Sequence, residues 1–220
     1  MNNIASYIDH TILSPTCSDL QIEQLCREAV SYNFAAVCVP PYYIKKAKSL
    51  LQHTSVKVAT VIGFPFGYSS ISAKLAEIHQ AIEDGVDELD MVHNLCALKN
   101  NDWEYLSKEI TTCLQPIRLH NKVIKVIIES GILEKDEIIK SCELYAKHKV
   151  DFVKTSTGYA ATGAVLEHVQ IMRHHLPENI AIKASGGIRD FAFAASLIVA
   201  GATRIGASAG VQIVAESNHQ

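Results

Sequence analysis

The sequence lacks paired cysteine spacings, long apolar runs and a leader segment. Its six cysteines are scattered without a C-x-x-C spacing, which argues against a disulfide framework and fits buried thiols in a reducing compartment. The longest nearly apolar stretch, residues 191–202, is too short to cross a bilayer, and the N-terminus has no basic or apolar leader. We therefore expect a cytoplasmic protein without a membrane partner.

Clusters of basic residues and metal-binding patterns are also missing. The formal charge is −3 and no run of lysine or arginine occurs, so neither nucleic acid nor an anionic surface is an expected partner. The ten histidines show no metal-ligand spacing. The sequence therefore predicts a small-molecule partner, with no metal and no cofactor.

Strand and helix patterns alternate along the whole chain. A chain of 220 residues with 48% hydrophobic residues suits one sizeable core, so a single domain over residues 1–220 is expected. Apolar strand-like segments lie at about 35–39, 56–62, 86–92, 122–129, 150–154, 180–183 and 202–208, with a weaker one within 4–13. Helical periods occupy about 18–30, 42–51, 72–84, 102–117, 135–147, 165–176 and 190–200.

This alternation predicts a parallel sheet covered by helices. Counting the weak first segment gives eight strands, and no G-x-G-x-x-G motif follows it. Both observations favour a closed (β/α)8 barrel, the TIM barrel, over an open doubly wound sheet.

Two lysines stand at the ends of predicted strands. Lys154 lies in V-D-F-V-K-T-S-T-G-Y and Lys183 in I-A-I-K-A-S-G-G-I-R. A lone lysine in such a place most often reaches solvent along its flexible stem. Neighbouring parallel strands about 4.8 Å apart would instead bring both amines into one pocket. Two like charges about 4 Å apart cost roughly 4 kcal/mol, or about three pKa units, which would leave one amine neutral and able to attack a carbonyl.

A carboxylate interrupts another predicted strand. Asp90 stands among apolar neighbours, and taken alone it would be assigned a structural hydrogen bond. Beside two lysines it can accept and return the protons that carbinolamine formation and dehydration require. Glu129, Lys125 and Asp9 are weaker candidates for the same role.

Glycines and small polar residues follow three of the predicted strands. The loops after the last two strands of a barrel commonly hold a phosphate on backbone N–H groups. The predicted substrate and phosphate-binding residues are Thr157, Gly158, Gly186, Gly187, Gly206 and Ser208. Arg189 either adds positive charge there or lies on the surface.

These motifs together resemble the deoxyribose-phosphate aldolase family over nearly the whole chain. The matching segments are D-H-T at 9–11, V-C-V at 37–39, I-G-F-P at 62–65, E-L-D-M-V at 88–92, V-K-T-S-T-G at 153–158, K-A-S-G-G-I-R at 183–189 and R-I-G-A-S at 204–208. The resemblance implies a class I aldolase that cleaves 2-deoxy-D-ribose 5-phosphate to D-glyceraldehyde 3-phosphate and acetaldehyde in deoxyribonucleoside breakdown. It also implies that Lys154 forms the Schiff base, that Lys183 perturbs its pKa and relays protons, and that Asp90 handles protons.

Some positions depart from the family pattern. Tyr159, His93 and Ala209 are unusual there, and residues 216–220 contain no tyrosine. These departures concern phosphate affinity and rate more than reaction type. Two other functions stay open, a Schiff-base aldolase for another phosphorylated sugar and a non-catalytic sugar-phosphate-binding barrel. The oligomeric state is open as well, with a homo-oligomer such as a dimer as one expectation.

Overall fold

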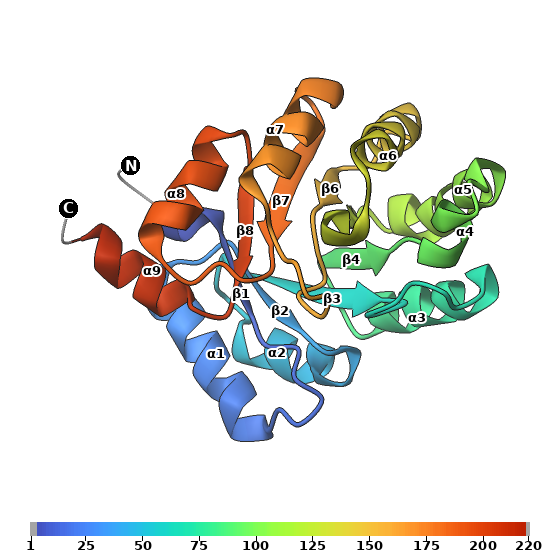
Figure 1. The fold of residues 1–220 in the computed structure, drawn as a ribbon. Coiled ribbons are helices and arrows are strands. Elements are labelled where there is room, and N and C mark those ends of the chain that lie inside the picture. The colour runs from blue at the N-terminus through green and yellow to red at the C-terminus, as the bar shows by residue number, and fades with distance from the viewer. Residues whose placement is uncertain (1–3, 219–220) are drawn as a thin grey trace.

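The chain forms a closed barrel of parallel strands with helices around it (Figure 1). The computed structural model describes residues 4–218. Each strand pairs with the next along the chain, and the last pairs with the first. The strands are β1 (Ile8–Thr11), β2 (Ala36–Val39), β3 (Lys57–Ile62), β4 (Glu88–Val92), β5 (Val123–Ile127), β6 (Phe152–Lys154), β7 (Ala181–Ser185) and β8 (Arg204–Ala207). The predicted (β/α)8 barrel is confirmed.

Helices cover the outside of the barrel (Figure 1). They are α1 (Asp19–Tyr32), α2 (Ile44–Leu50), α3 (Ile71–Glu83), α4 (Leu95–Lys99), α5 (Trp103–Leu119), α6 (Lys135–Lys147), α7 (Leu166–His175), α8 (Phe191–Val199) and α9 (Gly210–Ser217). Within residues 4–218, none of them combines the length and the apolar character that a membrane span needs.

Several predicted helices begin at side-chain caps. The carboxylates of Asp102 and Asp190 accept hydrogen bonds from the backbone N–H groups of Tyr105 and Phe193, at 2.9 and 2.8 Å. Each bond satisfies an N–H group that has no partner within the helix. Because these caps are local in sequence, the starts of α5 and α8 were predictable within a residue or two.

The sequence-based elements differ from the structure in two places. The weak first strand is present as β1 within residues 4–13, after a 3-10 turn at Ile4–Tyr7. The helix predicted at 42–51 begins as a second 3-10 turn, Pro41–Tyr43, before α2. Helices α4 and α9 were missed, since each is short and is stabilised by burying Leu98 or Ile213 against the rest of the fold.

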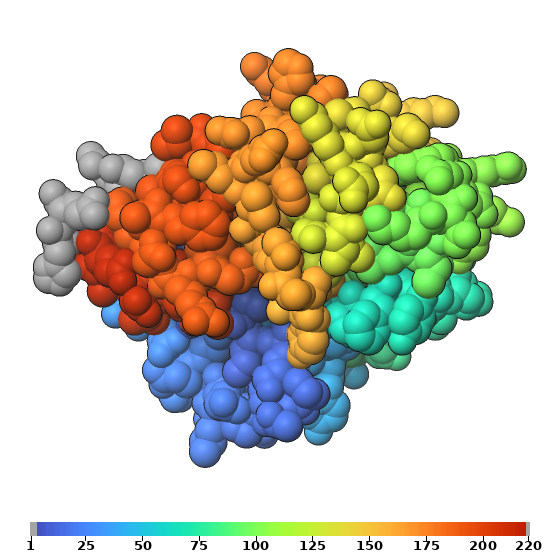
Figure 2. Space-filling model, viewed as in Figure 1, coloured from blue at the N-terminus to red at the C-terminus, as the bar shows by residue number. Residues whose placement is uncertain are grey.

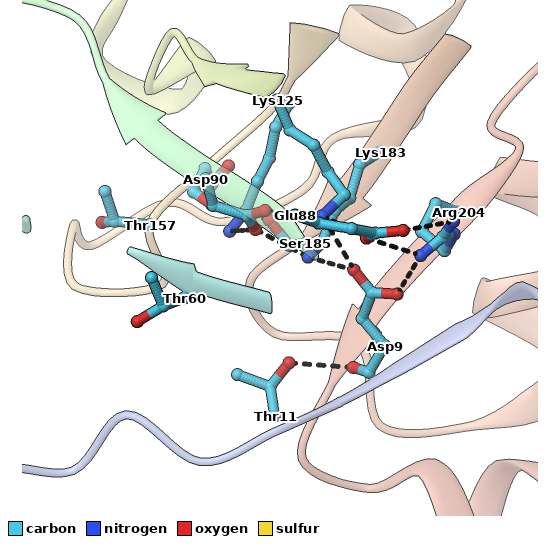
Figure 3. Close-up of polar contacts among 12 residues, drawn as sticks. Asp9, Thr11, Thr60, Glu88, Asp90, Lys125, Thr157, Lys183, Ser185 and Arg204 are labelled. Carbon is cyan, nitrogen blue, oxygen red and sulfur yellow. Dashed lines mark hydrogen bonds and ion pairs between the residues drawn. The ribbon is translucent and has the colours of Figure 1, made fainter. Parts of the chain in front are cut away.

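The barrel interior differs from the layer outside it. Side chains of a strand alternate between the two faces of the sheet, so half of them point away from the helices. Inside the barrel, Cys38, Ala59 and Val61 form a small apolar cluster separate from the main core. Much of the remaining interior holds charged side chains from β1, β4, β5, β7 and β8 (Figure 3). Barrel interiors are ordinarily filled by branched apolar residues, so these charges mark the candidate site.

Candidate active site

Lys154 is the last residue of β6 and lines a cavity of about 290 Å³. Its side chain is almost fully buried, and its Nζ donates a hydrogen bond to Asp90 Oδ2 at 2.8 Å. In the parallel pairing of β6 with β7, Lys154 lies opposite Lys183. The two strands are therefore neighbours, as the lysine argument required, and both amines donate to the same carboxylate oxygen.

Lys183 does not stand at a strand end, contrary to the sequence-based prediction. It is in the middle of β7, because the strand continues to Ser185. Its side chain is fully buried and is absent from the cavity lining. Its Nζ donates to Asp9 at 2.5 Å and to Asp90 at 2.7 Å. This location separates the two amines by access, since a substrate in the cavity meets Lys154 and not Lys183.

Asp90 binds three lysines. Its carboxylate accepts hydrogen bonds from Lys154, Lys183 and Lys125, the last at 2.7 Å. Burial raises the pKa of Asp90, but the three ammonium groups outweigh it and hold this pKa well below its ordinary value of 3.8. The carboxylate is therefore ionised in the resting site and lies within proton-transfer distance of the Lys154 amine.

The ion pairs continue around the barrel interior (Figure 3). Lys125 Nζ lies 2.6 Å from Glu88, and Arg204 contacts Glu88 at 3.1 Å and Asp9 at 2.5 Å. Since Asp9 also binds Lys183, the chain of contacts closes on itself. We call this closed chain the ionic ring; its members are Asp9, Lys183, Asp90, Lys125, Glu88 and Arg204.

The lysines around Asp90 have opposite pKa shifts. Burial is the largest influence on each of them and favours the neutral amine. For Lys183 and Lys125 the neighbouring carboxylates outweigh burial, so both pKa values are raised. For Lys154 burial prevails over the attraction of Asp90, the Lys183 charge adds to the effect, and the pKa is lowered. The sequence-based argument made Lys183 the main cause, whereas the structure places burial first.

The count of charges favours the same assignment. Four basic side chains, including Lys154, contact only three carboxylates in this cluster. When Lys154 loses its proton, three cations face three anions in the buried interior. Because an uncompensated buried charge is costly, the neutral form of Lys154 balances the cluster.

The residues predicted to bind phosphate line the same cavity as Lys154. These are Thr157, Gly158, Gly186, Gly187, Gly206 and Ser208. Arg189 and Tyr159 line it too. Tyr159 donates from its hydroxyl to the Leu13 carbonyl at 2.9 Å, and Figure 2 shows the segment after β6 lying against the N-terminal segment in blue. The cavity therefore spans from the amine to the glycine-rich loops, although ligand binding by these residues stays a prediction.

Two of these glycines have different structural reasons. Gly187 has a φ of +75° and no atom near a would-be Cβ, so its backbone faces open space in a conformation that disfavours side chains. Gly206 has an ordinary strand conformation. A Cβ there would lie 2.9 Å from Ser185 Cβ and 3.0 Å from Lys183 Cε. Gly206 therefore makes room for Lys183.

Thr157 is held by a buried glutamate. Its backbone N–H lies 3.2 Å from both carboxylate oxygens of Glu129, and its hydroxyl donates to Glu129 as well. Glu129 itself has a left-handed backbone, with φ +52°. Burial raises its pKa despite the bonds from Thr157. Both donors of Thr157 are thus occupied by Glu129, which fixes the loop that follows the Lys154 strand.

Sequence reasoning missed Glu88 and Arg204 as members of the site. It ranked Asp9 and Lys125 as weak candidates, although both contact the central charges. A signal was available, because Glu88 and Asp90 are two residues apart and so are Arg204 and Gly206. This two-residue period places each pair on one face of its strand. What the period does not give is which face points into the barrel.

His93 is a core residue. It is fully buried, with Nδ1 3.0 Å from the Tyr145 hydroxyl and Nε2 3.1 Å from the Ile128 carbonyl. Burial lowers its pKa to about 3. Among residues 4–218, no cluster of histidine, cysteine and carboxylate side chains is suited to hold a metal ion.

Known proteins resemble this chain over nearly its whole length. The model of the DeoC/LacD family aldolases matches residues 3–216. A deoxyribose-phosphate aldolase from Thermoanaerobacter sp. (strain X514) is 46% identical over 98% of this chain and 97% of its own length. One from Thermococcus gammatolerans is 47% identical over 96% and 95%. The solved tetrameric deoxyribose phosphate aldolase from Aeropyrum pernix superposes with a TM-score of 0.91, at 31% identity, covering 98% of this chain and 91% of that one.

Proposed function

The chain belongs to the DeoC/LacD family of aldolases, and from this premise we propose that Lys154 carries its reaction as a Schiff base. The activity is that of a deoxyribose-phosphate aldolase, an aldehyde-lyase acting on a sugar phosphate. The substrate 2-deoxy-D-ribose 5-phosphate loses its C2–C3 bond and yields acetaldehyde and D-glyceraldehyde 3-phosphate. The observation that carries the assignment to Lys154 is its position at the cavity, with a lowered pKa and Asp90 2.8 Å away.

The first half of the reaction makes the electron sink. The neutral amine of Lys154 attacks the C1 aldehyde of the open-chain sugar and forms a carbinolamine. A proton delivered to the carbinolamine hydroxyl lets it leave as water, and an iminium remains. We assign the movement of this proton to Asp90, which accepts a hydrogen bond from the amine and is bonded in turn to the protonated Lys183.

The second half breaks and repairs bonds on that sink. Removal of the proton from the C3 hydroxyl releases D-glyceraldehyde 3-phosphate, while the C2–C3 electron pair passes into the iminium and gives an enamine. Protonation at C2 restores an iminium, now of acetaldehyde. Water then adds, acetaldehyde leaves, and Lys154 returns as the free amine. The water lost in forming the first iminium is regained on hydrolysis of the second, so the reaction balances without an oxidant or a reductant.

The glycine-rich side of the cavity suits the phosphate end. Gly187 offers unobstructed backbone, and Arg189 and Ser208 line the same cavity. Backbone N–H groups and a nearby guanidinium are typical phosphate ligands. We therefore assign phosphate binding to these residues, with Gly186 and Gly158 shaping the loops by their positive φ values.

Trapping with borohydride tests the Schiff base. Brief exposure to acetaldehyde and borohydride should leave an ethyl group on Lys154 and abolish activity, and peptide mapping would locate it. The control is Lys154→Met, which should show only slow modification of surface lysines. An adduct found on Lys183 in the wild type would reverse the assignment.

A substrate comparison tests the sugar. Cleavage of deoxyribose 5-phosphate should far exceed cleavage of fructose 1,6-bisphosphate on the same preparation. Equal rates would favour an aldolase of other specificity, and no cleavage of either would favour a sugar-phosphate-binding barrel.

We further infer a cytoplasmic location and a homo-oligomer, a dimer in the first instance. The free thiols of buried Cys26, Cys38, Cys113 and Cys142 support a reducing compartment. The tetramer named for the Aeropyrum pernix relative supports self-association. Light scattering on the purified protein measures the assembly, and a monomer at micromolar concentration would contradict it.

A further inference from the structure

The ionic ring extends the charged interior away from the cavity. Two members of the ring are close to Lys154: Asp90 accepts a hydrogen bond from its amine, and Lys183 donates to the same Asp90 oxygen. Two other members, Glu88 and Arg204, are the first residues of β4 and β8. Neither of these two lines the cavity with Lys154. A role for them in the reaction must therefore act through the rest of the ring.

Glu88 and Arg204 are held in defined positions. The two nitrogens of the Arg204 guanidinium lie 3.1 and 3.3 Å from the two Glu88 oxygens, and one nitrogen also binds Asp9. The guanidinium lies over the Phe152 ring, 5.4 Å from its centroid. A bidentate, stacked arginine has little freedom to move. The pair thus presents fixed charges to Lys125 and Asp9.

Two of the three lysines that contact Asp90 also contact a second carboxylate of the ionic ring. Lys125 Nζ lies between Glu88 at 2.6 Å and Asp90 at 2.7 Å, and Lys183 Nζ lies between Asp9 and Asp90. The charges of Glu88 and Asp9 therefore determine how strongly the ammonium groups of Lys125 and Lys183 interact with the Asp90 carboxylate. Asp90 in turn decides how readily Lys154 keeps its proton.

We propose that Glu88 and Arg204 are positioning residues that, through the ionic ring, set the charge balance keeping the Lys154 amine ready to react. This inference rests on the proposed Schiff-base function. The two residues act in opposite directions. Without the Glu88 charge, the ammonium group of Lys125 interacts with Asp90 alone and the site becomes more positive. Lys154 then loses its proton more easily. Without the Arg204 charge, Asp9 and Glu88 hold Lys183 and Lys125 more strongly, so Asp90 is left to stabilise protonated Lys154.

The Lys154 amine faces charged and titratable groups from several elements. They are Asp90 on β4, Lys183 on β7, Lys125 on β5, Glu129 after β5 and the thiol of Cys38 on β2, with Asp9, Glu88 and Arg204 beyond them. The direct neighbours remain in place in each variant below. Only the balance among the ring members changes.

The test is the acid limb of the pH profile of kcat/KM, which reports the deprotonation that the free enzyme needs. Glu88→Gln should move this limb down by about one pH unit, and Arg204→Met should move it up by a similar amount. The double variant should return close to the wild type. The substrate phosphate titrates identically in all cases, so only differences between variants are compared. Arg118→Gln, which breaks a surface pair with Asp151, is the matched control and should leave the limb in place.

Shifts in the same direction for both single variants, or rate losses without shifts, would overturn the proposal. If a single variant fails to fold, Arg204→Lys keeps the charge and should keep the limb where it is. A limb that moves in Arg204→Lys despite the retained charge would also overturn it. Borohydride trapping on the wild type distinguishes failure of the proposed function from failure of this inference. An adduct off Lys154 defeats the proposed function, whereas an adduct on Lys154 with unshifted limbs defeats only this inference.

Discussion

Asp90 accepts hydrogen bonds from Lys125, Lys154 and Lys183, so at the scale of single residues it has two tasks. One is the proton transfer that we propose beside the amine, and the other is neutralising buried ammonium groups. The sequence suggested that these tasks were alternatives, which a substitution could separate. In the structure a substitution would affect both, because Oδ2, the oxygen that accepts from the Lys154 amine, also accepts from Lys183.

We therefore expect Asp90→Asn to lose turnover and stability together. Losing the proton carrier should lower kcat about 10²- to 10⁴-fold. Leaving buried lysines without their common anion should lower the free energy of unfolding by about 3–5 kcal/mol. Both are measured on one preparation, kcat well below the melting temperature and stability by urea unfolding. A folded Asp90→Asn variant with nearly normal turnover would contradict the proton role.

Lys183→Met should change the pH at which Lys154 reacts. Burial and then the Lys183 charge lower the Lys154 pKa, so removing that charge raises it and less neutral amine is present at pH 7. The acid limb of kcat/KM should move to higher pH, and activity at neutral pH should fall by orders of magnitude. Lys99→Met, at an exposed pair with Glu137, is the control. An unshifted limb in Lys183→Met would mean that burial alone tunes Lys154.

At the scale of elements, the strand ends and the loops after them have different roles in the site. Strand β6 ends at Lys154, whereas β7 continues past Lys183 to Ser185. Lys154 lines the cavity, whereas Lys183, its partner in the parallel register, is fully buried and does not. The loop after β6 is then fixed by the bonds from Thr157 to Glu129.

Gly187 and Gly206, which both line the cavity, should respond differently to an added methyl group. Gly187→Ala meets open space but must keep a φ of +75°, so it should raise KM for deoxyribose 5-phosphate and spare free deoxyribose. Gly206→Ala would press on Lys183 Cε at 3.0 Å, so it should lower kcat for both sugars. Steady-state kinetics with the two sugars measures this. Matching losses in the two variants would contradict the separate roles.

At the scale of the whole molecule, the buried charges link stability to pH. The folded-state pKa values of Asp9 and Asp90 are depressed below 3.8, because lysine and arginine charges outweigh burial. A depressed carboxyl pKa contributes stability above the unfolded value, and that stability is lost as pH falls below it. Burial raises the pKa values of Glu109 and Glu129 above 4.5. These two carboxyl groups therefore add stability as the pH falls, but this gain is complete before about pH 4.

The barrel should therefore lose stability steeply below about pH 4. Urea-unfolding midpoints followed by circular dichroism from pH 2 to 7 measure this. Asp90→Asn should flatten the acid slope, whereas Asp19→Asn, at an exposed carboxylate of α1, should leave it unchanged. A midpoint that stays constant down to pH 2 would show that these carboxylates are not held ionised by the fold.

The amino-acid sequence alone determined the barrel and the two lysines on neighbouring strands. Strand and helix periods, caps such as Asp102 and the lysine motifs are local patterns, so neighbouring residues suffice to interpret them. Tertiary structure alone decided which charges meet. Asp9 and Arg204 are 195 residues apart yet form an ion pair, because barrel closure brings β1 beside β8. It also decided that the pKa of Lys154 is lowered while that of Lys183 is raised, since burial and the number of partners are properties of the folded interior and not of any segment.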